Sequence, residues 1–277
     1  EIEMASAAAA GLHLSNHSYG WASGWLFGLG GDGNWYWLGD TSVSAVEDAG
    51  FGFYAGGTAE WDAIAHAAPR YLVVKSAGND RDDVGPGPDG GHYVWDGVAS
   101  DWVWSTETRD PDGGSDGHDT LPYRGNAKNI LTVGAVDDVP GGWSSPGDVV
   151  VTAFSGWGPT DDGRIKPDLV ANGVALFSPL GGADDAYGTY SGTSMAAPGA
   201  TGSLNLLLAQ YEDRLGETPL ASTLKAIVLH TADEAGPAPG PDYRHGWGLL
   251  NTARAALLVD DHAAGGRRLL ARADGQT

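Results

Sequence analysis

The sequence predicts an α/β fold in which a mainly parallel central sheet lies between two layers of helices. Short continuous apolar runs, such as residues 71–74 and 129–136, have the composition of strands that are buried on both faces. Segments with apolar residues at helical spacing, such as 58–68, alternate with these runs. Because parallel strands need long crossover connections, this alternation indicates helices on both faces and a site at the carboxyl ends of the strands.

Local signals locate the individual elements along the chain. Thr58 is a candidate N-cap and Pro69 a stop for one helix, while Thr218 and Pro219 begin another. The Gly- and Trp-rich stretch 20–57 has no steady period, which predicts a loop with at most one short helix. The predicted order is helix 1–10, strand 12–15, loop 20–57, helix 58–68, strand 71–74, a Gly/Asp-rich insertion at 80–126, strands 129–136 and 148–153, a fourth strand region at 167–171 and 174–177, and helices from Ser194 to 214–216, at 219–230 and at 251–259.

A length of 277 residues accommodates one large domain, or one domain and a tail. We predict a domain over residues 1–258, followed at 259–277 by a polar linker or the start of a further domain. The absence of cysteine excludes disulfides, zinc–thiolate sites and a cysteine nucleophile. No apolar run reaches the eighteen or so residues of a membrane span, so no membrane partner is expected.

The formal net charge of −21 is the strongest compositional feature, and the chain has only four lysines. An acidic surface of this kind repels phosphates, so no nucleic-acid partner is expected. It suits solubility in salt or the binding of cations. The simplest interpretation is a solvated acidic shell without a specific partner.

The most informative stretch is the octet Ser191–Pro198, which reads Ser-Gly-Thr-Ser-Met-Ala-Ala-Pro. Small residues precede Ser194 and a helix-forming sequence follows it, so its hydroxyl is predicted to lie unshielded at a helix N-terminus. The free N–H groups there stabilise an oxyanion when a serine attacks a carbonyl. Pro198 would fall within about the first turn, where a missing N–H costs least. The simpler alternative is a turn that caps a buried helix.

The octet resembles the nucleophile motif of the subtilisin-like serine proteases (subtilases, peptidase family S8). Further segments resemble this family in the family's order along the chain. They are Ser15–Gly20, Ser76–Asn79, Phe154–Pro159, Asp162–Asp168 and His245–Asn251. The resemblance covers residues 1–258 and implies a serine endopeptidase that hydrolyses peptide bonds through an acyl-enzyme.

The resemblance also implies roles for the matching residues. Ser194 would be the nucleophile, and Asn79 would donate its side-chain N–H to the oxyanion together with the Ser194 backbone N–H. Ser18-Tyr19-Gly20 and Ser76-Ala77-Gly78 would line a groove for extended peptide, although ordinary turns also explain such residues. The implied partner is a peptide or protein substrate, and the implied location is extracellular or the cell envelope.

The sequence departs from the family in lacking an Asp-Thr/Ser-Gly strand end and a His-Gly-Thr-His helix, which carry the catalytic aspartate and histidine. In the family both motifs precede the Ser-Tyr-Gly segment, and only fourteen residues precede Ser15 here. We therefore expect a C-terminal fragment of a subtilase domain, whose missing N-terminal segment supplies the acid and base. His17 is interpreted as a packing or substrate-contacting residue rather than as the base.

Two alternatives to a protease remain open. The first is a catalytically inert subtilase fragment or pseudoprotease that acts as a binding or structural unit. The second is an α/β-hydrolase esterase with Ser194, Asp233 or Asp242, and His245 as its triad. The octet lacks the second glycine of an esterase nucleophile elbow, which argues against the latter.

No cofactor is required, and calcium is considered only as a structural ion. The insertion contains Asp110, Asp112, Asp116 and Asp119, and hard cations bind several oxygen ligands. Their spacing does not match an EF-hand loop because Gly114 stands where a third ligand should be. A solvated loop is therefore the preferred interpretation, and no residue is assigned as a metal ligand.

Overall fold

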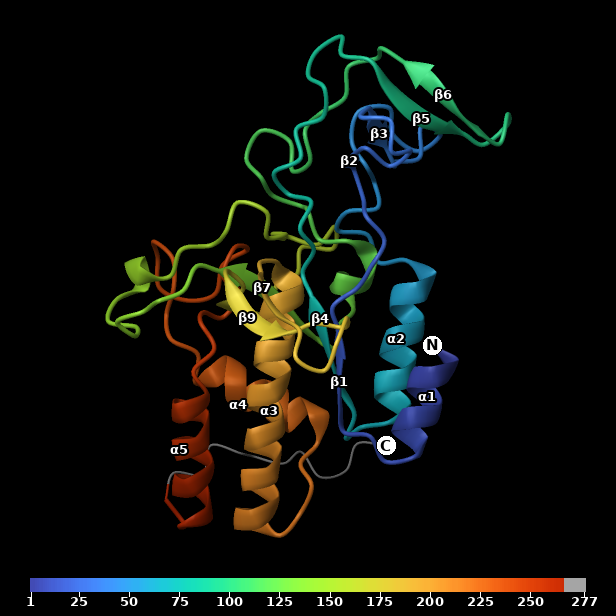
Figure 1. Cartoon of the computed structure of the whole chain (residues 1–277). Coiled ribbons are helices and arrows are strands. Elements are labelled where there is room, and N and C mark those ends of the chain that lie inside the picture. Colours follow the sequence, from blue (N-terminus) through green and yellow to red (C-terminus); the bar gives the residue numbers. More distant parts are fainter. Residues whose placement is uncertain (267–277) are drawn as a thin grey trace.

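The computed structural model describes residues 1–266, and a four-stranded parallel sheet lies at its centre (Figure 1). Its strands, in the order in which they pair, are β1 (Leu14–His17), β4 (Leu72–Ser76), β7 (Leu131–Val136) and β8 (Leu169–Asn172). Every residue of β4 and β7 is buried, which accounts for the mainly apolar sequences of these two central strands. The predicted α/β fold with a parallel sheet is confirmed.

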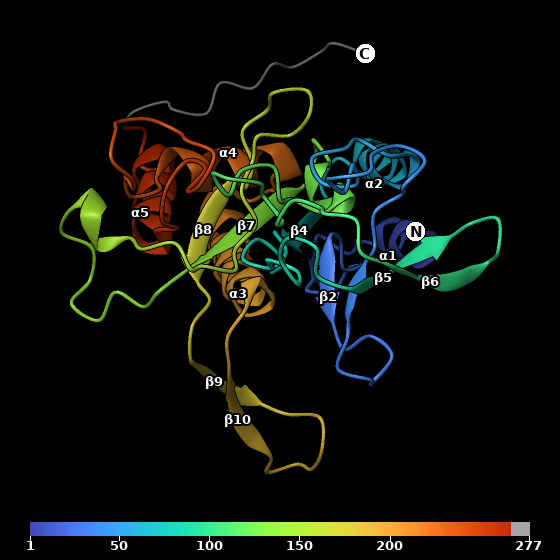
Figure 2. The same cartoon turned by 90° about the horizontal axis from the view of Figure 1, so that it is seen from above.

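Helices cover both faces of this sheet (Figures 1 and 2). They are α1 (Ile2–Ala9), α2 (Gly56–Ala67), α3 (Thr193–Leu215), α4 (Ala221–His230) and α5 (Thr252–Ala263). Leu72 and Val74 belong to the core cluster that includes α3, α4 and α5. Tyr71 and Val73 belong to the cluster with α1 and α2. Because successive strand residues point to opposite faces, this division produces the three predicted layers.

Helix α3 is the longest of the described helices and positions the octet. Leu204 and Leu207 are almost fully buried against the sheet, and each contributes roughly 1.5–3 kcal/mol by burial. The helix ends as predicted at Gly216, whose left-handed backbone (φ 70°) allows its N–H to donate to the Glu212 carbonyl at 2.9 Å.

A second, mixed sheet lies beyond the carboxyl ends of the central strands (Figure 1). It pairs β2 (Trp25–Phe27), β3 (Trp35–Trp37), β5 (His92–Asp96) and β6 (Asp101–Ser105) in that order. The prediction of loop over 20–57 was therefore wrong, because this stretch supplies β2 and β3. Its small core contains Trp25 and Trp37, which bury large apolar surfaces in very short strands.

The predicted strand at 148–153 is also wrong. A 3₁₀ turn, η2 (Pro146–Asp148), occupies its start, where the Asp148 carboxylate accepts hydrogen bonds from the backbone N–H groups of Ser144 and Ser145. Only an isolated bridge between Val151 and Val136 follows. The side chain of Asp148 thus favours a local turn over extended pairing.

The structure corrects several helix boundaries. Helix α2 begins two residues before Thr58, which donates instead to the Tyr123 carbonyl at 2.7 Å from η1 (Tyr123–Asn126). Helix α4 begins at Ala221, and Thr218 donates to Glu212 at 2.6 Å. Helix α5 continues to Ala263, so the predicted domain boundary after residue 258 falls inside a helix. The rest of the predicted linker, 267–277, lies outside the described residues.

Strands β9 (Leu176–Pro179) and β10 (Tyr187–Tyr190) form an antiparallel hairpin that projects from the body of the molecule just before α3 (Figure 2). In residues 1–266 no helix is long and apolar enough to span a lipid bilayer.

Candidate active site

Ser194 and Asn79 line the same pocket, which has a volume of about 250 Å³ and lies at the carboxyl edge of the central sheet. Asn79 follows the end of β4 by three residues, and Ser194 is the second residue of α3. Asn79 is exposed and Ser194 is half-buried, so a ligand can reach both. The lining residues are Ser18, Tyr19, Gly20, Trp21, Ala22, Lys75, Ser76, Gly78, Asn79, Asp80, Pro122, Tyr123, Arg124 and Ser194.

The side-chain amide of Asn79 has a defined orientation. Its Oδ1 accepts hydrogen bonds from the Thr193 backbone N–H at 2.8 Å and from Thr193 Oγ1 at 2.9 Å. A backbone N–H can only donate, so the oxygen must face Thr193 and the NH₂ group must face elsewhere. No residue in the described part of the chain accepts a hydrogen bond from Asn79 Nδ2. The amide therefore retains donors for a ligand.

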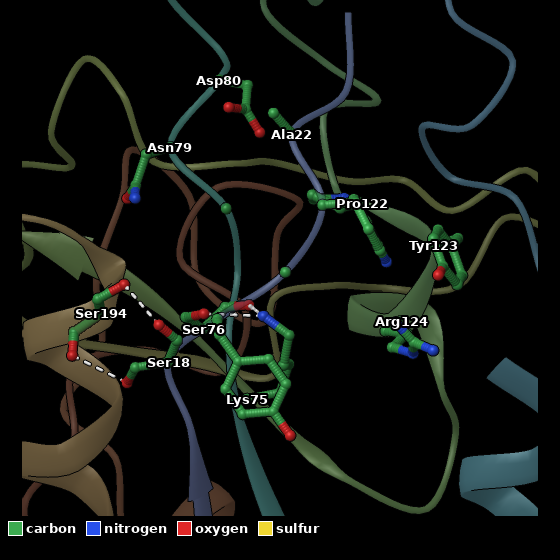
Figure 3. A pocket seen from close by; sticks show the side chains of 14 residues that line it. Ser18, Ala22, Lys75, Ser76, Asn79, Asp80, Pro122, Tyr123, Arg124 and Ser194 are labelled. Atoms are coloured by element: carbon green, nitrogen blue, oxygen red, sulfur yellow. Dashed lines mark hydrogen bonds between the residues drawn. The ribbon is translucent and has the colours of Figure 1, made fainter. Parts of the chain in front are cut away.

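The Ser194 backbone is tied to the segment after β1 through two reciprocal contacts (Figure 3). Ser194 Oγ donates to the Ser18 carbonyl at 3.2 Å, and Ser18 Oγ donates to the Ser194 carbonyl at 2.9 Å. Pro198 explains the second contact. It is the sixth residue of α3 rather than a first-turn residue as predicted, and its missing N–H leaves the Ser194 carbonyl without a partner in the helix.

Two glycines allow the backbones to approach at this point. Gly192 has φ +149°, and a Cβ there would lie 3.7 Å from the amide of Asn79. Gly78 has φ +101°, and a Cβ there would lie 2.7 Å from Pro122 Cδ. Both backbones lie in the region that favours glycine, so conformation requires a glycine at each position, and at Gly78 the space beside Pro122 requires it as well.

The predicted groove residues divide into two groups. Ser18, Tyr19, Gly20, Ser76 and Gly78 line the pocket, and their contact with substrate stays a prediction. Ala77 does not, and this part of the prediction is corrected. It is fully buried, and its N–H donates to the Val133 carbonyl at 3.0 Å, which continues the pairing of β4 with β7.

His17 is next to the groove but is fully engaged in packing contacts. Its Nε2 bonds to Ser15 Oγ and its Nδ1 to the Tyr19 hydroxyl, both at 2.7 Å, and its ring packs edge-on against Trp61. Burial, together with the charge of Lys75, lowers the pKa of His17 to about 4. Such a histidine is neutral near pH 7 and has no free nitrogen to accept a proton from Ser194.

His245 pairs with Asp242, at 3.1 Å between Nδ1 and Oδ2, as an esterase triad would require. However, neither residue lines the pocket of Ser194. Gly246 and Gly248 instead pack the segment after His245 against Asp168 and Asp233 at the edge of β8. This arrangement gives the esterase alternative no support.

Sequence reasoning missed the pocket's charged and aromatic wall. Lys75, Asp80 and Arg124 line it together with Trp21 and Tyr123. Lys75 carried a usable signal, because a lysine that continues the apolar run at 71–74 is predicted to be buried with its charge. Tyr123 and Arg124 belong to η1, far along the chain, and nothing local indicated their position.

Asp110, Asp112, Asp116 and Asp119 line one cavity, but the carboxylates of Asp112 and Asp116 have separate backbone partners. Asp112 accepts from the Trp25 N–H at 2.9 Å, whereas Asp116 accepts from the His118 N–H at 3.1 Å. Within residues 1–266 no group of three or more His, Cys, Asp or Glu side chains is arranged to hold a metal ion. The preference for a solvated loop over a structural calcium site stays a prediction.

The chain is thus an α/β protein with a parallel sheet between two layers of helices. At the carboxyl edge of the sheet it carries a serine at a helix N-terminus, with the side-chain amide of an asparagine in the same pocket. The chain belongs to the Subtilase family, whose profile matches residues 1–248. The resemblance identified from the sequence is confirmed.

Several proteases are similar to parts of the chain. C5a peptidase of Streptococcus pyogenes serotype M3 is 38% identical over 148 residues, which cover 51% of this chain and 12% of that protein. Serine protease AprX of Bacillus subtilis is 39% identical over 106 residues, covering 34% and 24%. The cell wall-associated protease of the same species is 28% identical over 169 residues, covering 53% and 16%. The chain thus matches well under half of each relative's length.

Solved structures share the fold. The patellamide maturation protease PatA aligns with a TM-score of 0.58 and 22% identity, covering 96% of this chain and 68% of PatA. A lanthipeptide protease aligns with a TM-score of 0.55 and 18% identity, covering 92% and 64%. The predicted subtilisin-like architecture is therefore confirmed at the level of the fold.

Proposed function

We propose that this chain supplies the nucleophile, the oxyanion hole and the substrate groove of a subtilisin-like endopeptidase. One observation carries the proposal: Ser194 and Asn79 line one pocket, and Thr193 holds the amide of Asn79 with its NH₂ group free. The Ser194 N–H, at the start of α3, also has no acceptor in the described part of the chain. Two donors are thereby available to a developing oxyanion.

In the proposed reaction, a base removes the proton of Ser194 Oγ as the oxygen bonds to the scissile carbonyl carbon. The carbonyl oxygen becomes an oxyanion, which the Asn79 side chain and the Ser194 N–H stabilise. The C–N bond then breaks, the amine leaves with the transferred proton, and water hydrolyses the acyl-enzyme to regenerate Ser194.

We propose that the base and its aspartate come from a segment outside this sequence. Ser194 Oγ donates to a carbonyl, and both nitrogens of His17 are occupied by hydroxyl groups. Strand β1 stands at one end of the sheet order, so its outer edge is available to a further strand. The same observations favour the second candidate, a non-catalytic binding unit, for the chain on its own.

The extracellular or cell-envelope location and the peptide or protein substrate are also part of this proposal. The cell wall-associated protease among the relatives supports the location, and the family supports the substrate class.

Reaction with a fluorophosphonate tests the assignment. The chain joined to its upstream segment is expected to be labelled at Ser194, and S194A is expected to be unlabelled. N79A should lower peptide hydrolysis about 10²–10³-fold, because it removes one oxyanion donor. Labelling at another residue would refute the nucleophile. Absence of labelling both with and without the upstream segment would leave the binding unit as the better description.

A further inference from the structure

Lys75 is buried in the same pocket as Ser194 and Asn79. It is the fourth residue of β4, is 4% exposed, and lines the cavity. Its Nζ donates to the carbonyl and to the hydroxyl of Ser76, both at 2.8 Å (Figure 3). An ammonium group has three N–H donors, so these contacts leave one donor for a ligand.

This lysine differs from the other buried lysine, Lys166. Lys166 is 2% exposed, and its Nζ lies 2.6 Å from the carboxylate of Asp168. No carboxylate of residues 1–266 lies within 4.0 Å of Lys75 Nζ. Buried charges in proteins are generally paired, so an ammonium without a carboxylate on the wall of a pocket indicates a place for an external anion.

The other charged groups around the pocket do not fill this role. The Arg124 guanidinium is already paired with Glu1 at 2.8 Å. Burial raises the pKa of Asp80 to about 7, so this carboxyl carries only part of its charge near neutrality. His17 is neutral there, because burial lowers its pKa to about 4. Burial lowers the pKa of Lys75 to about 8 against the opposing charge of Asp80, so the ammonium still carries most of its charge near pH 7.

The ammonium lies on the side of the cavity that faces the predicted substrate groove. A Cβ at Gly20 would stand 3.8 Å from Lys75 Nζ, so the ammonium lies directly beside the predicted groove segment. The volume of about 250 Å³ accommodates one side chain of moderate size. Ser194 and Asn79 stand on the same cavity, so a side chain that enters it belongs to a residue next to the reacting carbonyl.

We propose that the pocket binds the carboxylate of an aspartate or glutamate side chain, with Lys75 Nζ as its counter-ion. The chain would then select peptides with an acidic residue immediately before the cleaved bond. This inference rests on the proposed function, because it assumes that peptide lies in the groove beside Ser194.

Binding of matched peptides tests the inference without requiring catalysis. Four fluorescein-labelled peptide amides, identical except for a last residue of Glu, Gln, Leu or Lys, would be titrated with the full chain at pH 7 by fluorescence anisotropy. The Glu peptide should bind about tenfold or more tightly than the isosteric Gln peptide, because its carboxylate forms a charge-assisted hydrogen bond. The Lys peptide should bind most weakly.

Two variants separate the role of Lys75 from general charge effects. K75M should bind the Glu and Gln peptides equally, while its affinity for the Leu peptide is retained. K128M removes an exposed lysine outside the pocket and should keep the full preference. If K75M does not fold by circular dichroism, the Glu and Gln comparison on the unchanged chain still decides the question.

The outcomes distinguish this inference from the proposed function. Equal affinity for the Glu and Gln peptides, or an unchanged preference in folded K75M, would overturn the inference while peptide binding itself stands. If none of the four peptides binds, the proposed groove is wrong and the inference fails with it.

Discussion

The buried carboxylate of Asp168 joins two central strands, and its loss should destabilise the chain strongly. Asp168 immediately precedes β8, and its carboxylate accepts from Lys166 Nζ at 2.6 Å and Lys225 Nζ at 2.8 Å. It also accepts from the backbone N–H of Thr132 in β7 at 2.7 Å. The Asp168 and Lys166 side chains are only 8% and 3% exposed, so neither charged group is solvated by water.

The substitution D168N keeps the size of the side chain and removes its charge, which leaves the ammonium of Lys166 buried without a counter-ion. Breaking a buried pair in this way costs about 3–5 kcal/mol of unfolding free energy. In a chain of this size that loss corresponds to a fall in Tm of about 6–20 °C. The double variant D168N/K166M should recover part of the loss, because it removes the unpaired charge.

Urea denaturation followed by circular dichroism would measure these free energies. D260N provides the matched control, because Asp260 and Arg214 are 2.8 Å apart but have side chains that are 42% and 51% exposed. The control should lose only about 0–1 kcal/mol. An equally small loss in D168N would refute the view that the charge of Lys166 depends on Asp168.

The same pair predicts a dependence on pH. Burial alone would raise the pKa of Asp168, but the ammonium groups of Lys166 and Lys225 outweigh it and hold the pKa below the usual 3.8. Because the folded-state pKa is the lower one, the contribution of the carboxylate is present above pH 3.8 and is lost as the pH falls through the folded-state value. D168N should therefore differ least from the unchanged chain in strong acid.

Three further predictions concern the pocket and the second sheet. G78A should lose about 1–3 kcal/mol in urea denaturation, because its φ of +101° strains an alanine whose Cβ would meet Pro122 at 2.7 Å. Burial and the charge of Asp83 raise the pKa of Asp80 to about 7, so the unfolding free energy should fall as the pH rises from 4 to 7. D80N should flatten this part of the pH profile. W25A should lose about 3–5 kcal/mol, since Trp25 is 1% exposed, and limited proteolysis should then cleave first within 25–105.

The central sheet could be predicted from sequence because its strands are buried on both faces. Tyr71–Val74 and Ile130–Val136 are short apolar runs, and such runs need no knowledge of their partners to be recognised. The second sheet could not be predicted in this way. Tyr36 in β3 pairs with Tyr93 in β5, far along the chain, and each strand contributes only a few residues. Short runs rich in aromatic residues, such as Trp35-Tyr36-Trp37, were the available signal.

Some residues of the candidate site could likewise be predicted from the sequence and others could not. Ser194 and Asn79 were predictable because each stands in a short local motif beside a recognisable strand or helix. The orienting role of Thr193 and the pocket position of Lys75 depend on where side chains point after folding. Tyr123 and Arg124 belong to η1, which packs against α2 and places them at the pocket, and no local pattern specifies this placement.

Pro198 connects the fold to the site in a way that the sequence alone predicted differently. In the first turn a proline removes no helix hydrogen bond, because the N–H groups there have no acceptor in the helix. As the sixth residue of α3, Pro198 removes the hydrogen bond that an N–H at this position would donate to the Ser194 carbonyl. Ser18 Oγ donates to that carbonyl instead, so α3 is joined to the end of β1 at the reacting residue. Strand β1 stands at one end of the sheet order. A segment that pairs with its free edge would therefore be the direct neighbour of the strand that leads into this junction. The proposed upstream partner would therefore dock beside the backbone that positions Ser194, which gives assembly a direct physical route to the geometry of the nucleophile.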